Sequence, residues 1–303
     1  MYAHGATVIM ACRSLERGNK AKAEIEDAIE RGDPDVCVAT PAKHKRTSGK
    51  LLVRELDVSD LESVAAFAKA FQGEFGQLDV LVNNAGINGI GNDGPRRTKQ
   101  GVEKVFGTNF VGHYLLTRLL QPQLAKSTNA RVVNLASVMH HWSSSSVSGA
   151  ARGEDESNGY DHSKMAMILF AAELQRRHGA ATFNAVSVNP GFVDSDIWRG
   201  FDALPLVGKA FRFATALLAL TPAQGAVTTV AAAMGTWRGR VAGKLSEVTY
   251  LVPYYLPKGF WLPFEMMGPF AGARSVLPRL PRDEPAESRA LWDACEKLCA
   301  GYL

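Results

Sequence analysis

Long apolar runs are missing from this 303-residue sequence. A helix that crosses a bilayer needs roughly 18–20 consecutive apolar residues. The two most apolar stretches, 213–220 and 250–270, are too short or are interrupted by proline. Residues 1–5 also lack the positive and apolar regions of a secretory signal peptide. We therefore expect a protein of the cytoplasm or of a cytosol-facing membrane surface.

Cysteine is scarce, and its distribution predicts neither a disulfide framework nor a metal site. The four cysteines are Cys12, Cys37, Cys295 and Cys299. Cys295 and Cys299 lie four residues apart on a predicted helix, without a neighbouring histidine. Two half-buried thiols explain that pair better than metal ligands do. Reduced surroundings are the default for such a chain.

Clustered charge is absent over most of the chain. The 34 Lys and Arg against 30 Asp and Glu give a net charge of +4. One basic cluster, Lys43 to Arg46, lies in a polar stretch from Gly32 to Lys50 that is typical of a solvated surface insertion. A nucleic-acid role would need a basic stripe with aromatic residues, so we expect no nucleic acid. A mildly basic protein suits a phosphate-bearing cofactor equally well.

The composition that is present is that of an ordinary globular protein, 46% hydrophobic and 21% charged. Short apolar runs alternate with segments of helical period. The predicted strands are 6–12, 51–56, 78–82, 130–135 and 180–188; the predicted helices are 15–29, 59–75 with Ser59 as N-cap, 101–120, 160–174, 221–234 and 287–298; and 138–158 is predicted to be a loop. This alternation predicts one α/β domain over 1–303, with a doubly wound parallel sheet of buried strands between two layers of helices.

Tyr160 and Lys164 open a long apolar run of helical period. Their i, i+4 spacing places phenol and ammonium on one helix face, with Cβ atoms about 5–6 Å apart. A free phenol has a pKa near about 10, and a neighbouring cation is expected to lower that pKa. Such a tyrosine can exchange a proton with an alcohol near neutral pH. The alternative is an exposed pair on an ordinary amphipathic helix.

Small and polar residues follow the predicted strands, where ligands bind in open α/β sheets. Asn83-Asn-Ala-Gly86, Ser137 and Pro190-Gly191 each come directly after a strand. Asn109 lies inside a predicted helix, where its low propensity suggests a polar task. Plain turns at the strand ends and a solvated helix face for Asn109 are the alternatives.

Arg13 follows the first predicted strand. An arginine at this point of a nucleotide-binding sheet suits the 2′-phosphate that NADP carries. A solvated loop arginine is the alternative.

Taken together, these motifs resemble the short-chain dehydrogenase/reductase family, in their order and rough spacing. The finer resemblance is to its retinol-dehydrogenase-like branch, through the run from Tyr160 to Phe170, the tetrapeptide Ala11-Cys-Arg-Ser14 and the long gap between Ser137 and Tyr160. The resemblance covers Gly5 to about Val252 and returns in the last helix. It implies a Rossmann-type fold and a chemistry of hydride transfer.

The resemblance also implies roles for four catalytic residues. Tyr160 would be the general acid/base, and Ser137 would hydrogen-bond the same substrate oxygen. Lys164 would lower the pKa of Tyr160 and hold the nicotinamide ribose hydroxyls. Asn109 would order a water that links Lys164 to bulk solvent.

Cofactor contacts follow in the same way, and the cofactor they imply is NADP rather than NAD. Arg13 would favour NADP, since no acidic residue occupies positions 12–14. The implied neighbours of the cofactor are Asp57 and Val58 near the adenine; Asn84, Ala85 and Gly86 along its length; Pro190 and Gly191 by the nicotinamide; Ser195 near the nicotinamide amide or diphosphate; and Tyr160 and Lys164 at the ribose.

One departure from the family is the absence of its first strand and of the glycine-rich turn that binds the pyrophosphate. No such turn lies upstream of Ala6. Its loss would leave the strands at 6–12 and 78–82 with unpaired backbone groups. Either the sequence starts at an internal methionine of a longer protein, which we favour, or the chain is a weak or inactive enzyme.

A second departure is the apolar segment from Tyr250 to Arg274. Together with Phe192, Trp198 and Phe201, this segment would form a lid over an apolar pocket, or a surface that contacts lipid. The substrate would then be a lipophilic alcohol, aldehyde or ketone, of retinoid or steroid type. Core packing explains each of these aromatic residues equally well.

Three hypotheses remain open. The first is an NADP-dependent oxidoreductase on a lipophilic substrate, with peripheral membrane contact and a homodimer through the helices at Asn109 and Tyr160 as further expectations. The second is a non-catalytic, partner-binding protein. The third is a reductase of the same fold that acts on a pigment or another cofactor-like molecule.

Overall fold

The computed structural model describes most of the chain. The described residues are 1–2, 5–33, 49–90, 94–143, 146–154, 159–179, 183–203, 208, 212, 215, 219–235, 250–255 and 270–303. Most of the predicted surface insertion from Gly32 to Lys50, most of the apolar run at 213–220, and the middle of the segment at 250–274 lie outside them. The described chain divides into two compact units, Met1–Asp57 and Val58–Leu303.

The first unit is a β-α-β unit. Its elements are β1 (Thr7–Cys12), α1 (Leu15–Arg31) and β2 (Lys50–Glu55). β1 and β2 pair in parallel, from Thr7 with Lys50 to Cys12 with Glu55. Ser14 caps the start of α1 by accepting from the Arg17 amide, and Gly32 ends it in the left-handed region that glycine adopts readily. All three elements confirm the sequence prediction to within two residues.

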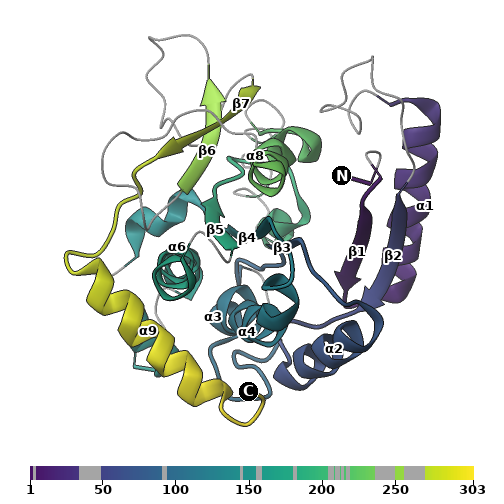
Figure 1. Cartoon of the computed structure of the whole chain (residues 1–303). Helices are drawn as coiled ribbons and strands as arrows, with labels where there is room; N and C mark the ends of the chain where they lie inside the picture. Colours follow the sequence, from purple (N-terminus) through teal and green to yellow (C-terminus); the bar gives the residue numbers. More distant parts are fainter. Residues whose placement is uncertain are drawn as a thin grey trace. The chain divides into compact units, whose positions relative to one another are not determined.

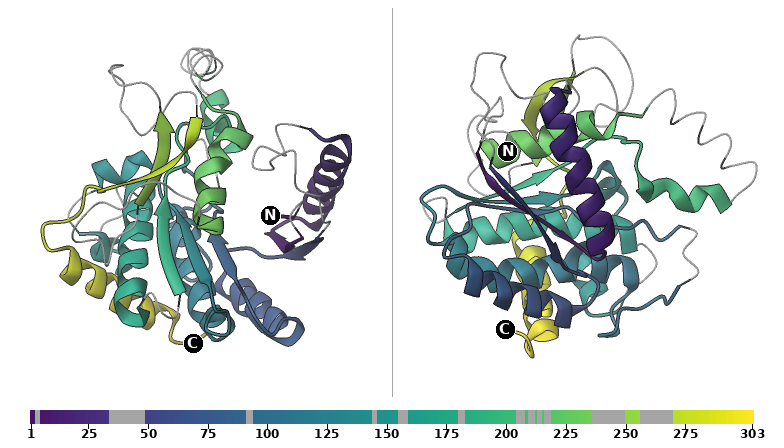
Figure 2. Two further views of the ribbon diagram at one scale, coloured as in Figure 1. Left: turned by 45° about the horizontal axis from the view of Figure 1, so that its top comes forward. Right: turned by 90° about the vertical axis from the view of Figure 1, so that its right-hand side faces the viewer.

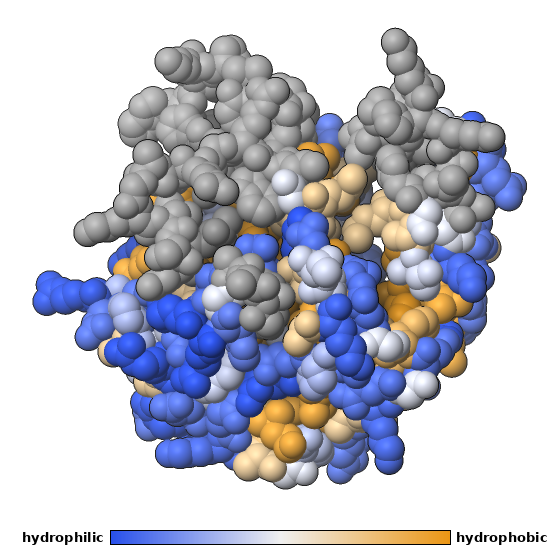
Figure 3. Space-filling view, in the orientation of Figure 1, coloured by the Kyte–Doolittle hydropathy of each residue, from blue (hydrophilic) through white to orange (hydrophobic). Residues whose placement is uncertain are grey.

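β1 is less buried than predicted. Its residues are exposed or half-buried, and within the described strands it is hydrogen-bonded to β2 alone. Apolar surface is visible in Figure 3 where β1 and β2 lie in Figure 1. The apolar composition of 6–12 is typical of a strand with neighbours on both sides, and here one side carries no described strand.

The second unit is built on a five-stranded sheet of order β3-β4-β5-β6-β7. Its strands are β3 (Val80–Asn83), β4 (Ala130–Leu135), β5 (Phe183–Val188), β6 (Tyr250–Tyr255) and β7 (Phe270–Val276). The first four run parallel and β7 is antiparallel to β6. Val132 and Val133 of β4 are fully buried, as expected of a central strand with helices on both faces.

Helices cover both faces of this sheet. They are α2 (Leu61–Glu74), α3 (Lys104–Phe106), α4 (Gly112–Leu124), α5 (Val147–Ala151), α6 (Gly159–His178), α8 (Pro222–Met234) and α9 (Glu284–Cys299), with the π-helix η1 (Gly107–Val111) and the 3-10 helices η2 (Val138–Trp142) and η3 (Asp196–Ala203). α4 and α6 lie on one face and α8 on the other (Figures 1 and 2). The predicted α/β fold, a parallel sheet with flanking helices, is confirmed.

Several boundaries differ from the prediction. Asp60, not Ser59, caps α2 by accepting from the Glu62 amide. The predicted helix at 101–120 begins at Lys104 and is π-helical around Asn109. The predicted loop at 138–158 contains η2 and α5. Thr221 caps α8 in the predicted way, with a reciprocal bond to Gln224.

The predicted lid at 250–274 is partly wrong. Its two ends are the sheet strands β6 and β7, and Tyr250, Leu251 and Val252 are fully buried. A run of apolar residues fits a buried strand as well as a lid, and periodicity alone does not distinguish them.

α9 packs along α6 (Figure 1) and also contacts α4. Trp292, only 5% exposed, packs against Tyr114 and Phe170 and lies under the guanidinium groups of Arg118 and Arg177. Of the helices that the structure describes, none combines the length and apolar character needed to cross a membrane.

Candidate active site

The site forms where β3, β4 and β5 end. Because these strands are parallel and in register, Asn83 beside Asn134 and Leu135 beside Val188, the residues that follow them meet at one edge of the sheet. The predicted Asn84–Gly86, Ser137 and Pro190–Gly191 all lie at this edge. The structure therefore brings together residues that are far apart in the sequence.

Tyr160 and Lys164 lie in the first two turns of α6. The Lys164 side chain is only 5% exposed, so an exposed pair on a solvated helix is excluded. Its Nζ lies 5.4 Å from the centroid of the Tyr160 ring and donates to the Leu135 carbonyl oxygen at 3.0 Å. An ammonium has three donors. Among the described residues Leu135 is its hydrogen-bond partner, so two donors stay available to a ligand.

Ser137 follows β4 and caps η2 by accepting from the Met139 amide. The Ser137 side chain acts on the Tyr160 phenol and favours a lower pKa of that phenol. The carbonyl oxygen of Ser137 pairs with Nδ1 of His140, at 2.7 Å, and His140 is fully buried. Ser137 is thus held in place through both its hydroxyl and its carbonyl oxygen.

Burial determines the pKa values of the pair. It raises the pKa of Tyr160 to about 12, although the hydrogen bond with Ser137 acts in the opposite direction. It lowers the pKa of Lys164 to about 8. The net pKa of Tyr160 is therefore raised in this structure, whereas a neighbouring cation is expected to lower it. The largest cause is desolvation, which disfavours the charged form of each group.

Asn109 is fully buried, so a solvated helix face is excluded. Its Oδ1 accepts from the Ile87 amide at 2.8 Å, and its Nδ2 donates to the Ile87 carbonyl at 2.8 Å and to Ser163 Oγ at 3.1 Å. Ser163 in turn donates to the Tyr160 carbonyl oxygen at 2.6 Å. The Asn109 side chain thus braces the loop after β3 against the start of α6. Its π-helical surroundings are frequent at functional sites.

Gly86 allows the closest approach within the site. A Cβ atom at this position would lie 3.2 Å from Asn109 Oδ1 and 3.7 Å from Lys164 Nζ. Asn84 and Ala85 beside it are exposed. Gly86 has no side chain, so a ligand can approach its backbone next to the Lys164 ammonium. The two available donors of Lys164 suit a ligand that carries hydroxyl groups, as the ribose of a nicotinamide dinucleotide does. The described residues therefore fit that cofactor.

The residues after β5 form a second fixed edge. Gly191 adopts a φ of 86°, which favours glycine, and its amide donates to Asn189 Oδ1 at 3.0 Å. Pro190 is half-buried and Ser195 is exposed just before η3. Asn88 donates from Nδ2 to the Ile197 carbonyl, so the loop after β3 is joined to η3 across the site.

Arg13 and Asp57 belong to the first unit, unlike the rest of the predicted site. Arg13 is exposed directly after β1, and Asp57 is half-buried two residues after β2. Val58 opens the second unit and is buried; its carbonyl lies against Gly112 of α4, where a Cβ would be 1.9 Å away.

One aromatic pair of the predicted apolar pocket is present. The rings of Phe192 and Trp198 meet edge to face with centroids 5.5 Å apart, and Trp198 Nε1 donates to the Val193 carbonyl at 2.9 Å. Both side chains are half-buried beside Gly191. The side chain of Phe201 lies outside the described residues.

The sequence analysis missed His113. It is 3% exposed, and its Nε2 lies 2.9 Å from the carbonyl oxygen of Ala85 in the candidate cofactor loop. A signal was present in the sequence: Asn109, His113 and Thr117 are polar residues spaced by four, which places them on one side of a helix.

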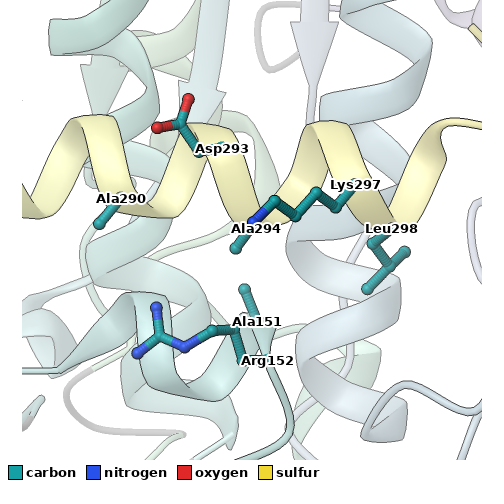
Figure 4. Close-up of a pocket in the computed structure, with 7 residues that line it drawn as sticks. All are labelled: Ala151, Arg152, Ala290, Asp293, Ala294, Lys297 and Leu298. Atoms are coloured by element: carbon teal, nitrogen blue, oxygen red, sulfur yellow. The ribbon is translucent and has the colours of Figure 1, made fainter.

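A cavity of about 510 Å³ lies elsewhere, between α5 and α9 (Figure 4). Arg152 and Lys297 flank an alanine-rich floor there, and none of the predicted site residues lines it. Among the described residues, no group of His, Cys, Asp and Glu is arranged to hold a metal ion.

Comparison with known proteins identifies the family of the chain. Residues 32–203 match the family model of the short chain dehydrogenases. Human retinol dehydrogenase 11 is 36% identical over 76% of this chain, and mouse retinol dehydrogenase 14 is 32% identical over 75%. Each match spans 65% of the relative's own length. The short-chain dehydrogenase/reductase prx1 of Penicillium roqueforti is 31% identical over 98% of this chain and 78% of its own.

Solved structures show the same fold. A crystal structure of an uncharacterised protein from Mycobacterium paratuberculosis superposes with a TM-score of 0.60 at 27% identity, over 98% of this chain and 85% of the other. An actinorhodin polyketide ketoreductase with NADPH superposes with a TM-score of 0.54 at 21% identity, over 76% of this chain and 81% of its own. With the family model and the relatives, the chain therefore belongs to the short-chain dehydrogenase/reductase family, in the branch that contains the retinol dehydrogenases.

Proposed function

We propose that the chain is an NADP-dependent oxidoreductase that interconverts a lipophilic alcohol and its aldehyde or ketone. The arrangement of Ser137, Tyr160 and Lys164 carries this proposal. The Ser137 side chain acts on the Tyr160 phenol, and a buried ammonium lies 5.4 Å from the phenol ring, at the edge of the sheet where ligands bind. One substrate oxygen can accept hydrogen bonds from both hydroxyls at once.

The protein moves the proton. In reduction, Tyr160 gives its phenolic proton to the substrate oxygen, and in oxidation it takes the proton of the alcohol. Ser137 donates a hydrogen bond to the same oxygen and stabilises the negative charge that develops on it. With a pKa of about 12, Tyr160 is protonated at neutral pH, which is the state that reduction requires.

The second unit supplies the residues that hold the nicotinamide half of the cofactor. The two available donors of Lys164 suit the ribose hydroxyls, and Asn84 to Gly86 offer an open backbone beside them. Pro190, Gly191 and Ser195 would border the nicotinamide, with Val58 and Asp57 toward the adenine. Bound there, the cofactor supplies or accepts the hydride.

The preference for NADP rests on Arg13. It is exposed at the end of β1, where a guanidinium can bind a phosphate through two parallel hydrogen bonds. Positions 12 and 14 are Cys and Ser, so no carboxylate there competes for ribose hydroxyls or repels a phosphate.

A lipophilic substrate is supported by the aromatic pair Phe192–Trp198 beside Gly191 and by the retinol dehydrogenases among the relatives. We propose an aldehyde or ketone of retinoid or steroid type. Such compounds partition into lipid, so peripheral membrane contact at a cytosol-facing surface belongs to the same proposal.

The test is NADPH-dependent reduction of retinal and of a steroid ketone by the purified 303-residue protein. Tyr160→Phe keeps the ring and removes the hydroxyl, so kcat should fall by a factor of roughly 10²–10⁴. Tyr302→Phe, the same change near the C-terminus, should leave kcat within about twofold, because the hydroxyl that it removes accepts only a long bond of 3.5 Å from Gln100 and contacts no candidate site residue in any described interaction.

Two results would contradict the proposal. One is the absence of turnover with every aldehyde and ketone offered together with NADPH. The other is equal activity of the wild-type protein and Tyr160→Phe, which would remove Tyr160 from the proton transfer.

A further inference from the structure

We propose that His113 is a positioning residue of the cofactor site, which fixes the peptide between Ala85 and Gly86 in the orientation that NADPH binding requires. This inference rests on the proposed function and adds a residue to it. His113 lies on α4, under the loop that follows β3, and it touches neither Tyr160 nor Ser137 in any described contact. Its role is exerted through the backbone of that loop.

His113 is the middle member of a polar column on one side of η1 and α4. Asn109 binds both backbone groups of Ile87, His113 pairs with the Ala85 carbonyl, and Thr117 accepts from the Asn83 side chain at 3.0 Å. The helix and the loop run in opposite directions. As the helix advances by four residues, from 109 to 113 to 117, its contact moves back by two residues along the loop, from 87 to 85 to 83.

The spacing of the two segments explains this match. Four residues of α-helix rise by about 6.0 Å, and two residues of extended chain span roughly 6.6 Å. The three successive contacts therefore stay aligned. The loop is held at Asn83, Ala85 and Ile87, and among the described contacts His113 is the residue that holds the Ala85 carbonyl, on the N-terminal side of Gly86.

The protonation state of His113 follows from its partners. A carbonyl oxygen only accepts, so Nε2 carries the hydrogen and donates to Ala85. Nδ1 is buried and has no hydrogen-bond partner among the described residues. A buried unpaired nitrogen costs free energy, and an apolar side chain at position 113 would avoid that cost. The feature that histidine adds at this position is therefore the hydrogen bond from Nε2 to the loop.

Fixing one carbonyl fixes a whole peptide unit. In a trans peptide the C=O of Ala85 and the N–H of Gly86 point in opposite directions. With the carbonyl turned toward α4, the Gly86 N–H is turned away from it. Gly86 also lies near Lys164, since a Cβ atom at this position would be 3.7 Å from Lys164 Nζ. If this peptide could rotate, the Ala85 carbonyl and the Gly86 N–H would exchange directions, and the loop would present a different group to a bound dinucleotide.

The test uses three variants at position 113 with a control on the same helix. His113→Gln carries an amide donor near the position of Nε2, His113→Asn is polar but too short, and His113→Leu is apolar. Gln123→Leu is the control, because Gln123 is also buried, also has an unpaired oxygen among the described residues, and lies at the far end of α4.

NADPH titration and amide hydrogen exchange give the two readouts. Loss of one hydrogen bond should raise the dissociation constant for NADPH about five- to tenfold in His113→Leu and His113→Asn. His113→Gln should stay within about threefold of the wild type, and Gln123→Leu should not change. The rate of amide hydrogen exchange at residues 84–88 should be higher than in the wild type in His113→Leu and His113→Asn, and close to the wild-type rate in His113→Gln.

The outcomes separate the two proposals. Wild-type protein that does not bind NADPH contradicts the proposed function, while local exchange at 84–88 still decides the role of His113. Unchanged affinity and exchange in His113→Asn would overturn the positioning role. So would a rise in exchange spread over all of α4 and the sheet, since that pattern marks general destabilisation. The Asn and Gln variants keep the test decisive if His113→Leu does not fold.

Discussion

At the scale of single residues, burial determines the charge state of the site. Lys164, Asn109 and His113 are each at most 5% exposed. Burial lowers the pKa of His113 to about 4; the bond to Ala85 opposes this shift and the charge of Lys164 adds to it. At neutral pH the histidine is therefore uncharged, the tyrosine is protonated, and Lys164 carries the positive charge of the group.

The first group of the site to titrate on raising the pH should be Lys164. Its pKa in the folded protein, about 8, lies below the model-peptide value of 10.5, so its charge is lost as the pH rises through about 8, well before Tyr160 titrates near 12. For the reduction reaction, kcat/KM should be constant below pH 8 and fall above it, since this parameter reports the free enzyme.

Lys164→Met is the control for that assignment. It should be much less active at pH 7 and should lack the fall near pH 8. A wild-type profile that stays flat to pH 10, or a variant that keeps the fall, would mean that another group titrates. The measurement is the initial rate of NADPH consumption against pH, at substrate concentrations well below KM.

At the scale of elements, α9 stabilises the helices that carry the site. Glu296 accepts from Tyr114 Oη and from Arg118 Nε, both at 2.6 Å, and Glu284 pairs with Arg176 of α6 at 2.9 Å. These bonds surround the buried ring of Trp292. The α6 helix is buried over most of its length, as a helix covered on both sides should be.

Trp292→Ala should lower the free energy of unfolding by about 3–5 kcal/mol, because it removes a buried ring and leaves a cavity. Trp142→Ala is the matched control: Trp142 is 62% exposed, and its loss should change stability by no more than about 0.5 kcal/mol. Urea unfolding measures both. Similar values for the two variants would show that α9 is not docked on α4 and α6 in solution.

Much of the fold, and the strand ends and the helix that carry the candidate site residues, could be predicted from the sequence. Alternating strands and helices gave the sheet, and Tyr160, Lys164 and Ser137 could be found because their spacing and strand-end positions are local signals. Local signals do not show burial, so the direction of the Tyr160 pKa shift was wrong. Ser59 and Asp60 are both good N-caps, and only the backbone distinguishes them.

The contacts that were missed depend on which segments lie side by side. His113 is an ordinary helix residue until α4 is placed antiparallel to the loop at 83–87. In the same way, Tyr250 to Val252 become core strand only through pairing with β5 and β7. Non-local pairing of this kind leaves a weak trace in any window of sequence.

At the scale of the whole molecule, the described chain divides into two units. The second unit carries Ser137, Tyr160 and Lys164, and the first carries Arg13. A homodimer stays a prediction. Since α9 packs on α4 and α6, pairing through these helices would have to use surface that α9 leaves open.

The most direct test of the account is calorimetric titration of the 303-residue protein with NADPH and, in parallel, with NADH at pH 7. We predict a dissociation constant for NADPH of roughly 1–100 µM and binding of NADH about tenfold or more weaker, since one charged contact at Arg13 is worth on the order of 1.5–3 kcal/mol. Equal affinity for the two would contradict the role of Arg13. Binding of neither would contradict the oxidoreductase assignment itself and favour a non-catalytic, partner-binding protein.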